Sequence, residues 1–140
     1  METNSIEFYE DAATNDLTCP TRDGLIDISG YSVRLGLLRA KWAKYLYIEE
    51  TIQNETQQEL NTIYSDRYMY YNYDYEYNVD KKDVPILIKG STEYKEAEKI
   101  YQSQVEKVKF INEVLSALNS QSFYLSTAMK HILWKSGETA

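Results

Sequence analysis

The sequence predicts an all-α protein made mainly of two long amphipathic helices. Its 140 residues include only 2 Pro and 5 Gly, so little interrupts regular structure. Apolar residues return every three or four positions over residues 31–71 and again over 91–136. The length suits a single domain covering residues 1–140. We therefore expect two helices that associate with each other and assemble as a helical oligomer.

Residues 1–28 predict an N-terminal arm. Ile6, Phe8 and Tyr9 are spaced for a short helical turn, but Cys19-Pro20-Thr21 and Asp23-Gly24 interrupt any longer helix. The first residues are acidic and contain no apolar stretch, so they do not predict a signal peptide. We expect this arm to be a loosely packed lead-in.

Residues 31–71 predict the first long helix. Its apolar stripe consists of Leu35, Leu38, Trp42, Tyr45, Ile48, Ile52, Leu60 and Ile63. A stripe this narrow over so many turns cannot be buried by the helix alone, so a partner helix is needed.

Residues 72–90 predict an extended connector. Tyr71, Tyr73, Tyr75 and Tyr77 alternate with polar residues, which is typical of a strand rather than a helix. Pro85 would confine any pairing of this segment to a sheet edge. We expect at most a short edge strand.

Residues 91–136 predict a heptad helix that mediates assembly. Gly90-Ser91-Thr92 offers a hydroxyl cap, and Glu93 lies in the first turn, where the helix dipole favours an anion. The steps of three and four keep one apolar face towards a partner. The residues expected to mediate oligomerisation are Val108, Ile111, Leu115, Leu118, Leu125, Met129 and Ile132.

Composition and motifs argue against an enzyme. His131 is the only histidine and Cys19 the only cysteine, so neither a catalytic cluster nor a disulfide is expected. There is no phosphate-binding glycine loop or metalloprotease motif, and we expect no metal or cofactor. No apolar run approaches the ~20 residues that cross a bilayer. These features predict a non-enzymatic, cytoplasmic protein without membrane contact.

One aromatic and basic set is typical of single-stranded DNA binding, in which rings stack on bases and cations contact the backbone. Its members are Lys41, Lys44, Arg67, Tyr68, Tyr70 and Tyr71. Two observations oppose this interpretation. The formal net charge is -7, whereas nucleic-acid binders are usually basic. The tyrosines could also be packing residues whose hydroxyls reach water.

The order of landmarks along residues 20–137 resembles the phage UvsY-type recombination mediators. These landmarks are Ile26-Asp27, Leu38-Arg39-Ala40-Lys41-Trp42, Arg67-Tyr68-Met69-Tyr70-Tyr71, Ile86-Leu87-Ile88, Thr92-Glu93-Tyr94, Val108-Lys109-Phe110, Phe123 and the Trp134–Gly137 terminus. Arg67 matches a basic position before the paired tyrosines, and Ser65 stands where a second basic residue is expected.

The resemblance implies a ring-like homo-oligomer, such as a hexamer or heptamer, held partly by the C-terminal helix. It also implies that the protein binds single-stranded DNA and helps to load a RecA-like recombinase in place of single-strand-binding protein. Such a role belongs to DNA recombination, repair and replication. The alternative from the residues alone is an acidic coiled-coil scaffold that does not bind nucleic acid.

Overall fold

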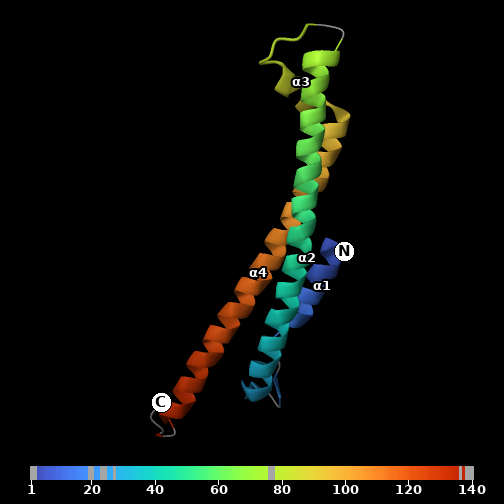
Figure 1. Cartoon of the computed structure of the whole chain (residues 1–140). Coiled ribbons are helices and arrows are strands. Elements are labelled where there is room, and N and C mark those ends of the chain that lie inside the picture. The colour runs from blue at the N-terminus through green and yellow to red at the C-terminus, as the bar shows by residue number, and fades with distance from the viewer. Residues whose placement is uncertain are drawn as a thin grey trace. The chain divides into compact units, whose positions relative to one another are not determined.

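The computed structural model describes residues 3–18, 21–22, 25–26, 28–75, 78–135 and 137, and it confirms the all-α class. Its helices are α1 (Ile6–Asp16), α2 (Ile28–Met69), the π-helical turn η1 (Tyr70–Asp74), α3 (Val84–Gly90) and α4 (Thr92–Lys135). Two-residue strands β1 (Thr21–Arg22) and β2 (Leu25–Ile26) pair antiparallel between α1 and α2. Figure 1 shows how α2 and α4 dominate the chain. No helix among the described residues is both long and apolar enough to span a membrane.

The chain divides into two compact units, and both long helices contribute to each. The central unit is Glu49–Val108, which contains the second half of α2, η1, α3 and the first part of α4. The terminal unit is Glu2–Ile48 together with Lys109–Ala140. It contains α1, the first half of α2 and the remainder of α4.

The terminal unit has an aromatic core in which α1 takes part. The Ser5 hydroxyl caps α1 by accepting from the Phe8 backbone N–H at 3.2 Å. Tyr9 and Ala13, four residues apart, place one face of α1 in the core and are buried. The expectation of a loosely packed lead-in is therefore wrong for residues 6–16. A short helix with only a few apolar residues on one face can be held in place when a longer helix supplies the rest of the core.

Trp42 lies at the centre of this core and is fully buried. Its ring contacts Tyr9 and Tyr45 at centroid distances of 6.0 and 5.3 Å. Its indole Nε1 donates to Asp16 Oδ2 at 2.9 Å, which satisfies the one polar atom that burial would otherwise leave unpaired. The buried residues of the terminal core are Tyr9, Ala13, Tyr31, Leu35, Leu38, Trp42, Ile111, Val114, Leu118 and Leu125.

The central unit has a smaller core at the end of α2. Val84 and Ile88 on α3 and Tyr94 on α4 are buried there. Partly buried residues packed against them are Leu60, Ile63, Tyr64, Tyr71 and Val79. As the sequence predicts, a hydroxyl caps the start of α4: Ser91 Oγ accepts from the Tyr94 N–H at 3.3 Å.

The connector is more helical than the sequence predicts, so the extended assignment of residues 72–90 is wrong in two places. Residues 84–90 form α3. Pro85 does not prevent this helix, because it lies in the first turn, where its missing N–H costs nothing. The α2 helix also continues into η1, and the Tyr75 N–H donates to the Tyr70 carbonyl at 2.8 Å. Tyr75 itself is extended, and Glu76 and Tyr77 lie outside the described residues.

Candidate nucleic-acid interface

Arg67 lies in the last turn of α2, and its guanidinium is held by Glu93 from the first turn of α4. Arg67 Nε and Nη2 both donate to Glu93 Oε2, at 3.1 and 2.6 Å. The side chains are 37% and 53% exposed, so water reaches both partners. The pair therefore joins two helices of the central unit at its surface.

Arginine side chains stay protonated in proteins, so Arg67 is a cation with or without Glu93. The hydrogen bond to the Glu93 carboxylate and its negative charge raise the pKa of Arg67 above its usual value. The guanidinium carbon also lies 6.0 Å from the centroid of the Tyr70 ring, within the range of a cation–π contact.

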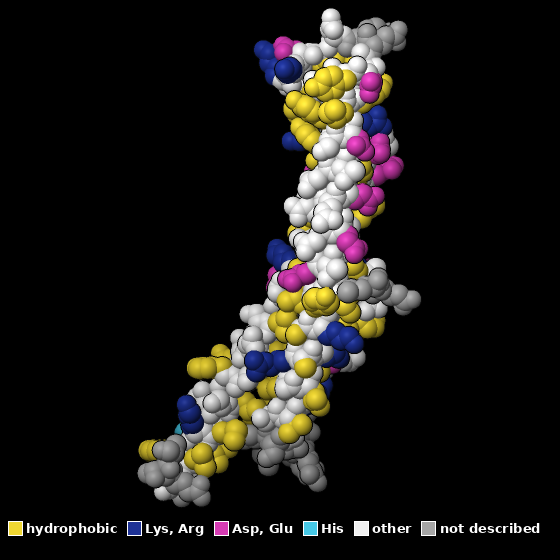
Figure 2. Space-filling view, in the orientation of Figure 1, with side chains coloured by type: hydrophobic (Ala, Val, Ile, Leu, Met, Phe, Trp, Pro, Cys, Tyr) yellow, Lys and Arg dark blue, Asp and Glu magenta, His cyan; other side chains and the backbone are white. Residues whose placement is uncertain are grey.

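The Tyr70 ring beside this cation belongs to a cluster of tyrosine rings. Tyr70, Tyr71 and Tyr75 contact one another edge to face, with centroids 5.1–5.7 Å apart. Tyr68 is stacked on Tyr64 at 6.5 Å. Tyr68 and Tyr70 are 40% exposed and Tyr73 is 75% exposed, so ring surface remains accessible. Figure 2 shows hydrophobic side chains gathered at this end of the central unit.

The six residues predicted to contact DNA fall into two groups. Arg67, Tyr68, Tyr70 and Tyr71 lie together in the central unit. The two lysines belong to the terminal unit. They are Lys41, whose Nζ lies 2.6 Å from Asp16 Oδ2, and Lys44, which is exposed.

Sequence reasoning overlooked a buried polar cluster in the central unit. Glu49 is fully buried, and Gln104 Nε2 donates to its carbonyl at 2.9 Å and to its Oε2 at 2.5 Å. Lys107 Nζ lies 3.8 Å from the same carboxylate oxygen. Gln104 was a usable signal, because an amide in a heptad seam needs a partner across the seam. The helical spacing also offered a signal at Glu49, which lies four residues after Tyr45 and three before Ile52 on the apolar stripe, whereas its exposed neighbour Glu50 lies off that stripe.

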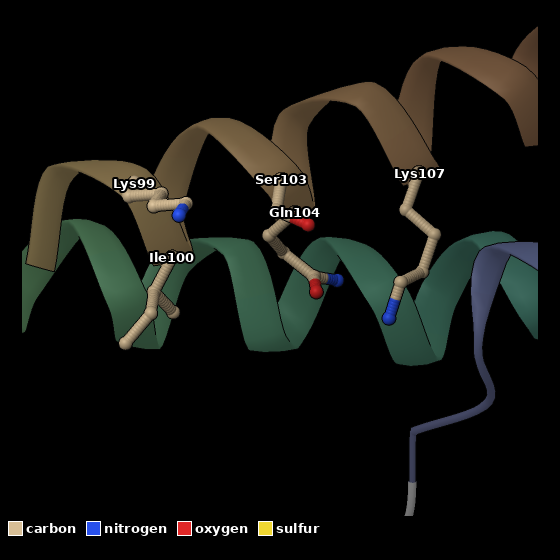
Figure 3. Close-up of a pocket in the computed structure, with 5 residues that line it drawn as sticks. All are labelled: Lys99, Ile100, Ser103, Gln104 and Lys107. Atoms are coloured by element: carbon tan, nitrogen blue, oxygen red, sulfur yellow. The ribbon is translucent and has the colours of Figure 1, made fainter. Parts of the chain in front are cut away.

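A surface pocket of about 370 Å³ adjoins this cluster. It is lined by Lys99, Ile100, Ser103, Gln104 and Lys107, all on α4. Figure 3 shows the ends of the Gln104 and Lys107 side chains directed towards α2. Their partner is Glu49, so these two groups serve the contact between the helices of the central unit.

The residues predicted to mediate oligomerisation differ in their burial. Within the chain itself, Val108, Ile111, Leu118 and Leu125 are buried and Leu115 is half-buried. Met129 and Ile132 are 44% and 52% exposed, in a segment of α4 with several other exposed apolar side chains. These are Phe123, Tyr124 and Trp134. Of the predicted residues, the four buried ones are thus packed within one chain, Leu115 is partly exposed, and Met129 and Ile132 expose the most surface.

The sole histidine of the sequence and the acidic residues form no candidate metal site among the described residues. His131 is exposed, and its ring stacks on Trp134 at 6.3 Å. Among the described residues, no group of three or more His, Cys, Asp or Glu is placed to hold a metal ion. What the site offers is a cation with accessible aromatic rings.

Comparisons with known proteins return no match: no family model, curated protein or solved structure is similar to this chain at a significant level.

Proposed function

We propose that the protein is a non-enzymatic recombination mediator of the UvsY type, which binds single-stranded DNA and helps a RecA-like recombinase to replace single-strand-binding protein. The ordered landmarks in the sequence, from Leu38 to the C-terminal Trp134, support this assignment. The all-α fold with a long C-terminal helix is compatible with it. A cytoplasmic location and a ring-like homo-oligomer belong to the same proposal.

The observation that carries the proposal is the Arg67 cluster at the end of α2. A guanidinium forms bidentate contacts with phosphate, and exposed rings stack on bases without regard to sequence. Arg67 and Tyr70 are in contact, with Tyr71 against Tyr70, so one nucleotide could meet both groups. This arrangement would favour single strands, whose bases are free to stack.

An oligomer explains how a protein with a net charge of -7 could hold DNA. Each chain would contribute one weak site, and linkage of several sites raises the effective concentration of the next site along the strand. Weak individual contacts also suit a mediator, because the DNA must pass on to the recombinase.

Fluorescence anisotropy with a labelled oligonucleotide at low and moderate salt tests the proposal. We expect binding that weakens with salt, since cations that contact phosphate release counterions. Arg67→Ala should weaken binding, whereas Lys95→Ala, with the same charge change on an exposed residue of the central unit, should have a smaller effect. If the two variants bind alike, Arg67 is not the contact. If the protein shows no salt-sensitive binding, the mediator function fails.

The second candidate is a coiled-coil scaffold without nucleic-acid binding. The exposed apolar side chains of Phe123, Tyr124, Met129, Ile132 and Trp134 favour association in either case. Ile132→Asp should reduce the sedimentation coefficient of an oligomer, while Lys130→Asp, a neighbouring change that also adds negative charge, should affect it less. An oligomer that persists while DNA binding is absent would select the scaffold.

A further inference from the structure

Glu93 occupies the Nε and Nη2 edge of Arg67, one of the edges at which a guanidinium can donate two hydrogen bonds to a phosphate. Arg67 Nε and Nη2 both point to Glu93 Oε2, and these are two of the donors that form the guanidinium fork. A phosphate oxygen is an acceptor of the same charge and similar geometry. Carboxylate and phosphate therefore compete for one position.

From this geometry we infer that Glu93 is an internal competitor that sets the affinity of the Arg67 site for the phosphate of single-stranded DNA. The inference rests on the proposed function. Arg67 exchanges the Glu93 carboxylate for a phosphate when DNA binds, and returns to Glu93 when the strand leaves.

Exposure makes this exchange feasible. With side chains 37% and 53% exposed, both partners are hydrated once separated, so an unpaired charge is never left in a dry interior. The Lys41–Asp16 pair is different, because the Asp16 side chain is only 11% exposed and the same oxygen accepts from buried Trp42. A phosphate cannot displace Asp16 without disturbing the core.

The neighbouring rings keep Arg67 in place during the exchange. The Tyr70 ring lies 6.0 Å from the guanidinium carbon and contacts Tyr71, which is packed against the buried core of the central unit. The cation thus has a support that does not depend on Glu93. Release from the carboxylate would leave it directed at the exposed tyrosine surface.

The test compares Glu93→Gln with Glu96→Gln, an equal charge change at an exposed residue one turn further along α4. Anisotropy with a labelled single-stranded oligonucleotide should show Glu93→Gln binding about two- to fivefold tighter than the wild-type protein, as expected for loss of an exposed ion pair. Its slope of log affinity against log salt should equal that of the wild-type protein, because Arg67 contacts the same phosphate in both complexes. Glu96→Gln should give the smaller change that net charge alone produces.

The double variant Arg67→Ala with Glu93→Gln ties the gain to the guanidinium. The gain in DNA affinity from adding Glu93→Gln to Arg67→Ala should be no larger than the gain from adding Glu96→Gln to the wild-type protein. Equal gains for Glu93→Gln and Glu96→Gln, or a gain that survives without Arg67, would overturn the inference while leaving DNA binding established. Absence of salt-sensitive binding by wild type and Glu93→Gln alike would overturn both the proposed function and this inference. Far-ultraviolet circular dichroism confirms that each variant is folded.

Discussion

The terminal and central units each contain a cation paired with a carboxylate, but the two pairs serve different ends. Asp16, at the end of α1, pairs with Lys41 and also accepts from the buried indole of Trp42, so it is part of the terminal core. Glu93 meets Arg67 at the surface, with no buried group depending on it. The same chemistry is therefore structural at Asp16 and replaceable at Glu93. What separates them is the burial of the carboxylate.

The largest effect should come from the terminal core. Trp42→Ala removes a fully buried indole from an aromatic cluster and leaves a cavity, which should lower the free energy of unfolding by about 3–5 kcal/mol. Chemical denaturation followed by circular dichroism measures the change. Tyr47→Ala on the same helix, at a ring that is 64% exposed, is the matched control and should cost far less. Similar losses for both variants would mean that Trp42 is not central to the core.

The next largest effect should come from the buried polar cluster around Glu49, and it tests whether that cluster stabilises the central unit. Gln104→Ala removes the two hydrogen bonds that the Gln104 Nε2 donates to the Glu49 carbonyl and carboxylate. Loss of two hydrogen bonds to a fully buried residue, one of them to its carboxylate, should reduce stability by about 1–3 kcal/mol. The exposed neighbour Gln102 provides the control variant, Gln102→Ala. A Gln104 variant as stable as the control would show that the Glu49 cluster contributes nothing to the central unit.

Helix periodicity made the buried residues of the two long helices predictable from the sequence, but not the structure of the connector. The stripe through Leu35 and Trp42 and the seam through Ile111 and Leu118 place buried residues correctly, because helix geometry alone puts them on one face. The prediction for the connector was wrong because alternating tyrosines suggest a strand, whereas Tyr70, Tyr71 and Tyr75 come into contact through a π-helical turn. Tertiary packing overrode a local pattern there.

The cations and aromatic rings of the candidate site could be predicted from the sequence, but the carboxylates that pair with the cations could not. Arg67 and Tyr70 are three residues apart on one helix, so sequence spacing brings them together. Asp16 and Glu93 are each 25 or 26 positions from their cations, and only the packing of separate helices makes those pairs. No local pattern carries that information. The paired state of both cations therefore required a structure.

A smaller effect should appear at high pH and belongs to the central core. Burial, and then the negative charge of Glu98, raise the pKa of Tyr94 above its ordinary 10.0. As pH rises past that value the unfolded chain loses the proton first, so stability that is complete below it should fall above it. Tyr94→Phe should lessen this alkaline loss in denaturation curves measured at several pH values. Tyr47→Phe, at an exposed ring of the terminal unit, should not.

The smallest effect returns to the two ion pairs. Glu93→Gln should change the free energy of unfolding very little, because an exposed pair loses in hydration nearly what it gains in attraction. Asp16→Asn should lower the free energy of unfolding by more. The Asp16 carboxylate lies between Lys41 and the buried Trp42 indole, where little water can solvate these partners once the charge is removed. Denaturation of both variants under one set of conditions makes the comparison. Equal losses would mean that burial of the carboxylate does not separate the two pairs. A negligible loss at Glu93 beside a clear loss at Asp16 would mean that only the central pair can open without cost to the fold, as exchange with a phosphate requires.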